Sequence, residues 1–253
     1  MAKQLNLDMP IATGNTAKIY LHENQILKVF RDNFHESEAA YEASKQNIAY
    51  SSGLPVPKVI DVTKIDGKPA LIMEYIKGKT LGDLLMLEKN NAAYYLEISI
   101  DIQRKIHEIT TDSLEPISKK LIRQIQYVDR LNEQQKAYLL KKLDQMKFEP
   151  RLCHGDFHLY NLILTEDKQI VIIDWVDSSV GDIRADVYRT YLLYSQHSLE
   201  LAELYLNLYC EKSGVSREDI FEWAPIIAGA RLAEIVPSEN QGRLLQIVSS
   251  YYE

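Results

Sequence analysis

The sequence contains only two cysteines, Cys153 and Cys210, in 253 residues. So few cysteines exclude a disulfide scaffold and suit a reducing compartment. No apolar run reaches the ~18 residues of a membrane-spanning helix, and the first ten residues lack the apolar core of a secretory signal. We therefore expect a cytoplasmic protein with no membrane partner.

The sequence also lacks an excess of basic residues. It has 29 Lys and Arg against 36 Asp and Glu, which gives a net charge of −7, and this balance argues against a nucleic-acid partner. The charge is uneven, because residues 177–253 hold twelve acidic and six basic residues, or −6. This acidic segment either attracts a cationic ligand or is a solvated acidic surface.

The most informative stretch is 151–176, RLCHGDFHLYNLILTEDKQIVIIDWV. Asp156 and Asn161 lie in a polar, irregular segment, and two short apolar strands follow at 162–164 and 169–173, joined by a polar turn of hairpin length. Asp174 ends the second strand. Asp and Asn side chains offer the oxygen ligands that Mg²⁺ takes, so Asn161 and Asp174 are candidate metal ligands. Asp156 then remains to accept a proton from a hydroxyl.

HGD-x4-N followed by IIDW resembles two motifs of the aminoglycoside phosphotransferase and choline kinase superfamily, relatives of protein kinases. The resemblance implies an α+β, protein-kinase-like bilobal fold. Residues 1–77 would form a nucleotide-binding lobe, a small antiparallel sheet with one helix. Residues 78–253 would form a mainly helical catalytic and acceptor-binding lobe. It also implies ATP as the phosphoryl donor, Mg²⁺ on Asn161 and Asp174, and Asp156 as the catalytic residue.

The apolar strand 25–30 contains one charge, Lys28, and burying an unpaired ammonium is costly. The resemblance makes Lys28 the lysine that reaches the nucleotide phosphates. We expect a helix over 35–50 to supply its partner, either Glu38 or Glu42, and the resemblance of 53–57, GLPVP, to a segment of the same family favours Glu42. The strand–loop–strand pattern at 11–21, with Gly14 and Asn15 in its turn, is expected to cover the phosphates.

The same resemblance assigns an adenine pocket to apolar and backbone groups. ALIMEYIKGKTL at 70–81 is similar to the family's hinge segment. The expected nucleotide-binding groups are Ile26, Met73, the carbonyl of Glu74, the amide of Ile76, Ile163 and Ile173.

Helical patterns are expected over most of the second half, at 81–87, 92–109, within 117–147, and at 187–196, 199–213, 218–231 and 243–251. His107 is expected to be a hydrogen-bonded core histidine. Asp186 is similar to the family's aspartate that braces the catalytic loop. Tyrosines at helical spacing (188, 191, 194, 205 and 209) are interpreted as core packing or as an aromatic cage for a quaternary amine.

The resemblance concerns phosphoryl transfer, and it leaves the acceptor open. An aminoglycoside-like or other cationic hydroxyl compound suits the acidic segment, with four candidate contacts: Asp177, Asp182, Glu222 and Glu234. Such an acceptor would imply a role in antibiotic resistance. The alternatives are a choline, sugar or amino-alcohol kinase, or a nucleotide-binding pseudokinase regulator. A protein kinase is disfavoured, because no long activation segment or A-P-E motif follows Asp174.

Overall fold

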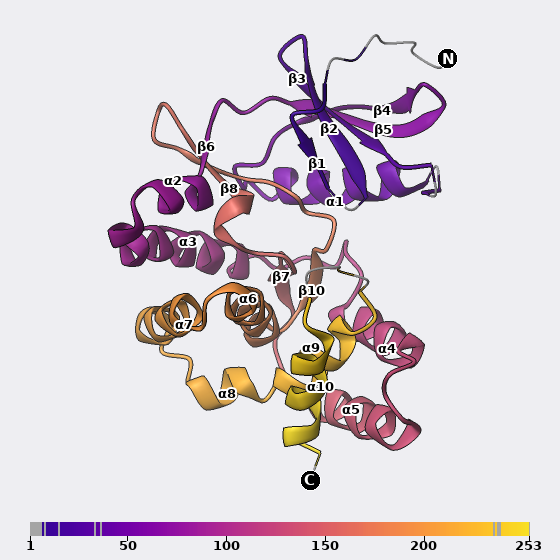
Figure 1. Ribbon diagram of the computed structural model, residues 1–253, viewed down its shortest axis with the longest axis vertical. Coiled ribbons are helices and arrows are strands. Elements are labelled where there is room, and N and C mark those ends of the chain that lie inside the picture. Colours follow the sequence, from indigo (N-terminus) through magenta and orange to yellow (C-terminus); the bar gives the residue numbers. More distant parts are fainter. Residues whose placement is uncertain are drawn as a thin grey trace. The chain divides into compact units, whose positions relative to one another are not determined.

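The computed structural model describes residues 7, 9–14, 16–32, 34–35, 37–234, 236 and 239–252. The chain forms two compact units (Figure 1). The first unit comprises Met1–Leu84 and Tyr160–Val176, and the second comprises Leu85–Leu159 and Asp177–Glu253. These limits differ from the division expected after residue 77. Residues 78–84 and 160–176 join the first unit because strands from these two segments pair with each other.

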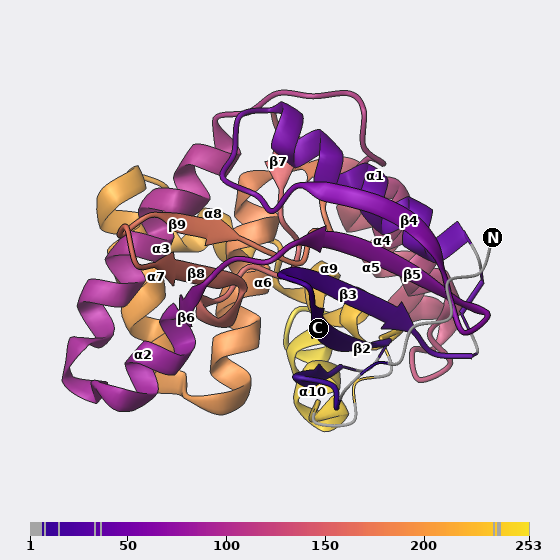
Figure 2. The same cartoon turned by 90° about the horizontal axis from the view of Figure 1, so that it is seen from above.

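The first unit contains an antiparallel five-stranded sheet in the order β1-β2-β3-β5-β4 (Figure 2). Asp66 and Gly67 connect its last two strands with φ angles of 49° and 81°, as the hairpin turn expected of an Asp-Gly pair requires. The strands are β1 (Ala12–Thr13), β2 (Ala17–His22), β3 (Gln25–Phe30), β4 (Val59–Ile65) and β5 (Lys68–Glu74).

Helix α1 (Ser37–Ser51) packs on one face of this sheet. Its small residues Ala39 and Ala43 contact Phe30 of β3, whereas Leu27 and Val29 belong to a separate apolar cluster. This division follows from strand geometry, because successive side chains of a strand point to opposite faces. The alternation turns Lys28 toward α1.

A second sheet of the first unit has the order β6-β8-β9. It consists of β6 (Gly78–Thr80), β8 (Leu162–Thr165) and β9 (Ile170–Ile172), which confirms the hairpin expected after Asn161. A Cβ on Gly78 would lie 2.3 Å from the Leu164 carbonyl oxygen, so only glycine allows this strand pairing. Thr80 caps α2 (Leu81–Leu87), because its Oγ1 accepts a 3.0 Å hydrogen bond from the Asp83 amide.

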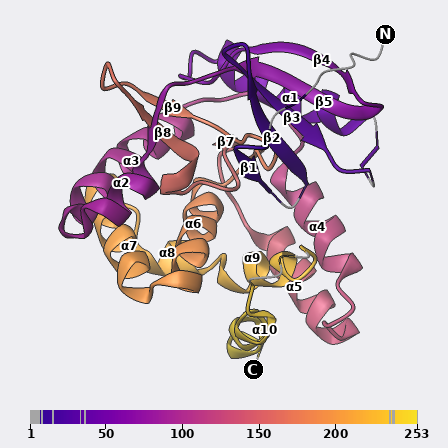
Figure 3. The ribbon, with the colours of Figure 1, turned by 45° about the horizontal axis from the view of Figure 1, so that its top comes forward.

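The second unit is mainly helical, with one short antiparallel pair of β7 (Arg151–Cys153) and β10 (Ser179–Gly181). Figure 3 shows α6 beside α7, and α9 beside α10. Its helices are η1 (Lys89–Asn91), α3 (Ala92–His107), α4 (Ile117–Tyr127), α5 (Glu133–Gln145), α6 (Ile183–His197), α7 (Leu199–Ser213), α8 (Arg217–Phe221), α9 (Ala224–Arg231) and α10 (Gln241–Ser250). Two elements span a limit between the units: α2, between Leu84 and Leu85, and η2 (Leu159–Asn161), between Leu159 and Tyr160.

One expected helix is in fact two. The pattern over 218–231 divides into α8 and α9, with Pro225 in the first turn of α9. Proline has no amide proton and clashes with the preceding turn, so the chain turns before it and buries Trp223 there.

The tyrosines of this unit are core residues. Tyr188, Tyr205 and Tyr209 are almost fully buried, and Tyr205 packs against both Tyr194 and Tyr209. The packing interpretation is therefore confirmed for these side chains. Among the described residues, no helix has the length and apolar character needed to cross a bilayer.

Candidate active site

The HGD segment forms a tight loop directly after β7. Gly155 has a φ of +81°, and a Cβ at this position would lie 2.4 Å from the Asp177 carbonyl oxygen. Glycine is the residue that adopts this backbone conformation without steric cost. His154 is fully buried beside Phe157, with ring centroids 5.7 Å apart. The loop is therefore fixed on both sides of Gly155.

Asp186 of α6 holds this loop. One of its carboxylate oxygens accepts a 2.7 Å hydrogen bond from the Gly155 amide, and the other accepts from His107 Nε2 at 2.9 Å and Gln103 Nε2 at 3.2 Å. Burial acts to raise the pKa of Asp186, but the bonds from His107 and the Gly155 amide outweigh it and lower the pKa. His107 is thus a hydrogen-bonded core residue and Asp186 braces the loop, as expected.

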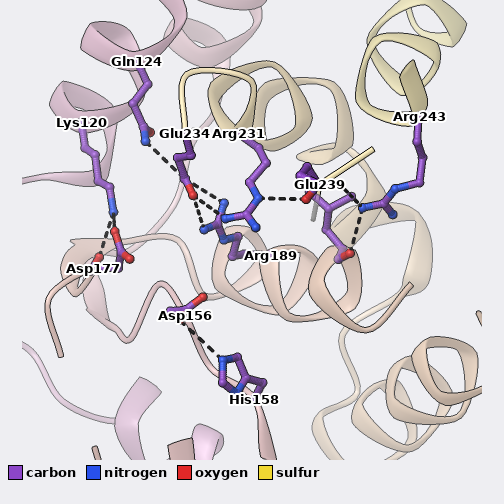
Figure 4. Close-up of polar contacts among 11 residues, drawn as sticks. Lys120, Gln124, Asp156, His158, Asp177, Arg189, Arg231, Glu234, Glu239 and Arg243 are labelled. Atoms are coloured by element: carbon purple, nitrogen blue, oxygen red, sulfur yellow. Dashed lines mark hydrogen bonds and ion pairs between the residues drawn. The ribbon is translucent and has the colours of Figure 1, made fainter. Parts of the chain in front are cut away.

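Asp156 follows Gly155 and lies 3.5 Å from His158, measured from Oδ2 to Nε2 (Figure 4). Burial acts to raise the pKa of the Asp156 carboxyl. The hydrogen bond with His158, and the charges of His158, Arg189 and His154, have the larger effect and hold this pKa well below its usual range. Asp156 is consequently ionised at neutral pH.

In the first unit, Lys28 lies between two carboxylates. Its Nζ is 2.6 Å from Glu42 Oε1 and 3.3 Å from Asp174 Oδ1. Burial acts to lower the pKa of Lys28, but Asp174 and Glu42 together raise it. The ammonium therefore stays charged. Of the two helix residues considered as its partner, Glu42 is the one in contact.

Asn161 and Asp174 come together at one end of the β8–β9 hairpin. The Ile173 amide donates a 3.0 Å hydrogen bond to the Asn161 carbonyl, so the backbone holds Asn161 beside the residue that precedes Asp174. Asp174 has a φ of +64°, in the left-handed region that aspartate enters more readily than most residues. Both side chains offer oxygen atoms, which fits a magnesium ion.

The expected adenine-binding residues lie around these two sheets. Ile26 and Met73 are cross-strand partners on β3 and β5, and Glu74 ends β5. Ile76 lies between β5 and β6, Ile163 lies on β8, and Ile173 follows β9.

Gly14 occupies the turn between β1 and β2. Its amide donates to the Ala17 carbonyl at 2.9 Å, and its carbonyl accepts from Arg31 Nη2 at 2.9 Å. Asn15, which was expected beside it, lies outside the described residues. The first unit thus contains the expected adenine-binding residues together with Lys28, Glu42, Asn161 and Asp174. Asp156 belongs to the second unit.

The four acidic candidates for a cationic acceptor each lie beside a basic side chain. Asp182 is buried and binds Arg184 at 2.6 Å, and Glu222 lies 3.9 Å from the same guanidinium. Asp177 binds Lys120 at 2.6 Å, and Glu234 binds Arg189 at 2.8 Å.

The basic partners Lys120 and Arg189, and His158 beside Asp156, were missed in the sequence analysis. Arg189 lies one helical turn after Asp186, on the same side of α6. That spacing was the available signal. Lys120 is 57 residues from Asp177 in the chain, so no local pattern indicates this pair.

Comparison with known proteins supports the same fold. The profile of the phosphotransferase enzyme family matches residues 9–225. A thermostable mutant of aminoglycoside phosphotransferase APH(4)-Ia, in ternary complex with AMP-PNP and hygromycin B, superposes with a TM-score of 0.70 at 16% identity, covering 96% of this chain and 93% of that one. The gentamicin complex of APH(2")-IIa superposes with a TM-score of 0.67 at 18% identity, covering 97% of this chain and 91% of that one. These likenesses confirm the α+β, kinase-like fold expected from the sequence.

Curated relatives include two proteins named acyl-CoA dehydrogenase family member 11. The protein from Pongo abelii is 27% identical over 177 residues, and the one from Homo sapiens is 25% identical over 177 residues. Each match covers 60% of this chain, but only 22% and 23% of the relatives. The chain therefore spans about a fifth of the length of these proteins.

Proposed function

Because the chain belongs to the phosphotransferase enzyme family, we propose that it transfers the γ-phosphoryl group of ATP to a hydroxyl group of a small molecule. The observation that carries this proposal is the position of Lys28, buried between Glu42 and Asp174. A buried lysine held between two carboxylates stays charged and oriented, as a contact to nucleotide phosphates requires. ATP is supported as the donor by the AMP-PNP in the APH(4)-Ia complex.

Each polar group then has a role. Lys28 contacts the nucleotide phosphates, and Glu42 fixes its position. Asp156, ionised at neutral pH, orients the acceptor hydroxyl and accepts its proton as the new oxygen–phosphorus bond forms. Asp186 acts through the Gly155 amide and keeps the loop that carries Asp156 in place.

Asn161 and Asp174 would hold a magnesium ion. Their amide and carboxylate oxygens match the preference of this cation, and a bound ion would screen the negative charge of the phosphates. Lys28 contacts Oδ1 of Asp174, so the other carboxylate oxygen of the same side chain can bind the metal.

The chemical class of the acceptor is argued from the solved relatives and from the charged residues of the second unit. The solved relatives include complexes with hygromycin B and gentamicin, so aminoglycosides belong in a first panel beside choline, sugars, amino alcohols and hydroxy acids. A preference for cations would rest on four acidic side chains that already lie beside Lys120, Arg184 and Arg189. We therefore propose a small-molecule hydroxyl compound without restricting it to cations.

The test is release of ADP from Mg-ATP across this panel, with Asp156→Ala as the central variant. Removal of the proton acceptor is expected to lower turnover by about 10²–10⁴-fold, while the protein still folds and binds nucleotide. Asp144→Ala serves as a matched control, because Asp144 is an exposed residue of α5. It should leave turnover unchanged.

Retained turnover in Asp156→Ala would exclude the assigned role of this residue. Magnesium-dependent nucleotide binding without turnover of any acceptor would instead favour a regulator. Phosphorylation of a generic protein substrate would favour a protein kinase.

A further inference from the structure

The backbone of Asp174 has a conformation that its neighbours must impose. Its φ of +64° lies in the left-handed region, which costs free energy for any residue with a side chain, although aspartate tolerates it better than most. Such a conformation persists only where the surrounding structure determines it. The groups that hold the chain on either side of Asp174 therefore decide where its carboxylate lies.

Before Asp174, the chain is held by backbone hydrogen bonds. The Ile172 amide donates to the Pro55 carbonyl at 2.8 Å, and the Ile173 amide makes the bond to Asn161 described above. The residue after Asp174 is also fixed, because the indole of Trp175 is fully buried and its Nε1 donates to the Ile172 carbonyl at 3.3 Å. These bonds fix the chain as far as Trp175.

Beyond Trp175, the chain is held by a side chain of α1. Nζ of Lys45 donates a 2.7 Å hydrogen bond to the carbonyl of Val176, two residues after Asp174. Lys45 is 4% exposed, and its Nζ lies 4.6 Å from the centroid of the Tyr41 ring. Hydrogen bonds from charged donors are stronger than those between neutral groups. Lys45 therefore fixes the peptide that follows Trp175.

Helix α1 thus reaches the segment 174–176 at two points, all within the first unit. Glu42 contacts Lys28, which in turn contacts Oδ1 of Asp174. Lys45 contacts the Val176 carbonyl. Glu42 and Lys45 are three positions apart and so lie on the same side of the helix. The first link acts on the side chain of Asp174, and the second acts on the backbone beyond it.

We propose that Lys45 is a positioning residue for the metal ligand Asp174. Its bond to the Val176 carbonyl keeps residues 174–176 in the conformation in which Asp174 binds magnesium. Without this bond, the backbone of Asp174 relaxes from its left-handed φ and the carboxylate changes position. The inference rests on the proposed function, because it takes Asn161 and Asp174 as the metal ligands. Lys45 acts through the backbone and has no contact with the metal.

The test compares nucleotide binding with and without magnesium. Isothermal titration calorimetry gives the Kd of ADP in EDTA and in excess Mg²⁺, and the ratio of these values, the magnesium ratio, measures how far the metal tightens binding. Lys45→Met removes the ammonium and keeps a side chain of similar length. We expect the magnesium ratio to fall about 10-fold in this variant, while the Kd in EDTA stays close to that of the wild-type protein.

A purely structural role of Lys45 would give a different result. Loosening of α1 or of the sheet would weaken the contacts to adenine and to the phosphates, which ADP makes in both conditions. Both Kd values would then rise together, and the magnesium ratio would not change. The ratio therefore separates positioning of the metal ligand from a general loss of stability.

Gln46→Met is the matched control. Gln46 is the next residue of α1, is 2% exposed, and donates a 2.7 Å hydrogen bond to the Pro57 carbonyl. The variant therefore loses a bond of the same length, from the same helix, to a different backbone carbonyl. It should keep the magnesium ratio of the wild-type protein, whatever its effect on stability and on ADP binding in both conditions.

Circular dichroism and Tm establish that each variant folds. If Lys45→Met does not fold, Lys45→Gln replaces it, because the amide side chain stays polar but is one atom too short to keep the bond to Val176. The same fall in the magnesium ratio is expected. Failure of both variants to fold would assign Lys45 to folding alone and overturn the inference.

An unchanged magnesium ratio in Lys45→Met, or an equal fall in Gln46→Met, would also overturn the inference. So would ADP binding that does not respond to magnesium in the wild-type protein. If the ratio falls in Lys45→Met alone but no acceptor is phosphorylated, the inference stands and the proposed phosphoryl transfer fails. If an acceptor is phosphorylated in an Asp156-dependent reaction and the ratio in Lys45→Met is unchanged, the proposed function stands and the inference fails.

Discussion

Gly155 sets the geometry of the HGD loop through its backbone. Its φ is positive, and a Cβ added there would lie only 2.4 Å from the Asp177 carbonyl oxygen, so the loop has no room for a side chain. Gly155→Ala should therefore move the loop and break the hydrogen bond to Asp186. Turnover should fall, and the free energy of unfolding should fall by about 1–3 kcal/mol. Urea unfolding and ADP release measure the two effects.

Gly214 provides the control for this substitution. It has a similar φ of +74°, but a Cβ there would meet nothing within 4 Å. Gly214→Ala carries the backbone cost alone, about 1 kcal/mol, and should keep full turnover. If the two variants lost stability equally and both remained active, the close approach at Gly155 would have no part in the site.

Single residues were predictable where their role is local. The turn at Asp66-Gly67 and the capping residue Thr80 follow from side-chain and backbone preferences within a few positions. The basic partners of the acidic residues were not predictable in this way, because Arg189 and Glu234, for example, are 45 positions apart in the chain. Charge counts along the chain therefore suggested an acidic surface, whereas in the folded protein Asp177, Asp182 and Glu234 each bind a basic side chain.

At the scale of elements, β3 and α1 are joined by the contact between Lys28 and Glu42, to which the proposed function gives a role in nucleotide binding. Lys28→Met removes the cation from a pair whose side chains are 11% and 2% exposed, and should cost about 3–5 kcal/mol because the buried charge of Glu42 loses the cation that offsets it. The double variant Lys28→Met, Glu42→Met should recover most of this stability but no turnover. Chemical denaturation and ADP release distinguish the two results.

Lys18→Met controls for the loss of a lysine from the same sheet. Lys18 is an exposed residue of β2, so its replacement should change stability by no more than about 0.5 kcal/mol. Turnover restored in the double variant would show that Lys28 is needed for folding and not for the reaction.

The elements themselves were largely predictable, since hydrophobic periodicity fixes their type. The β8–β9 hairpin and α7 lie where the sequence indicated. Two features were not indicated: Pro225 divides one expected helix, and the pairing of β6 with β8 groups residues 78–84 with the first unit. Neither pairing partners nor unit limits are encoded in the periodicity of a single segment.

At the scale of the whole molecule, nucleotide binding should raise the thermal stability. Mg-ADP at about 100 times its Kd adds about 2.7 kcal/mol, which corresponds to a rise in Tm of roughly 5–10 °C for a chain of this size. Chelation of the metal by EDTA should remove most of the rise. Differential scanning fluorimetry with ADP alone, Mg²⁺ alone and both together measures this. An equal rise with EDTA present would argue against metal-assisted binding.

The first unit is built from two separate parts of the chain, and this has a consequence for synthesis on the ribosome. Strand β6 emerges early, but its register pairs Gly78 with Thr165, which is translated much later. At about 5–20 residues per second the nascent chain waits roughly 4–17 s for this partner. During that interval the edge of β6 is open to other strands, so the yield of folded protein should depend on chaperones that shield it.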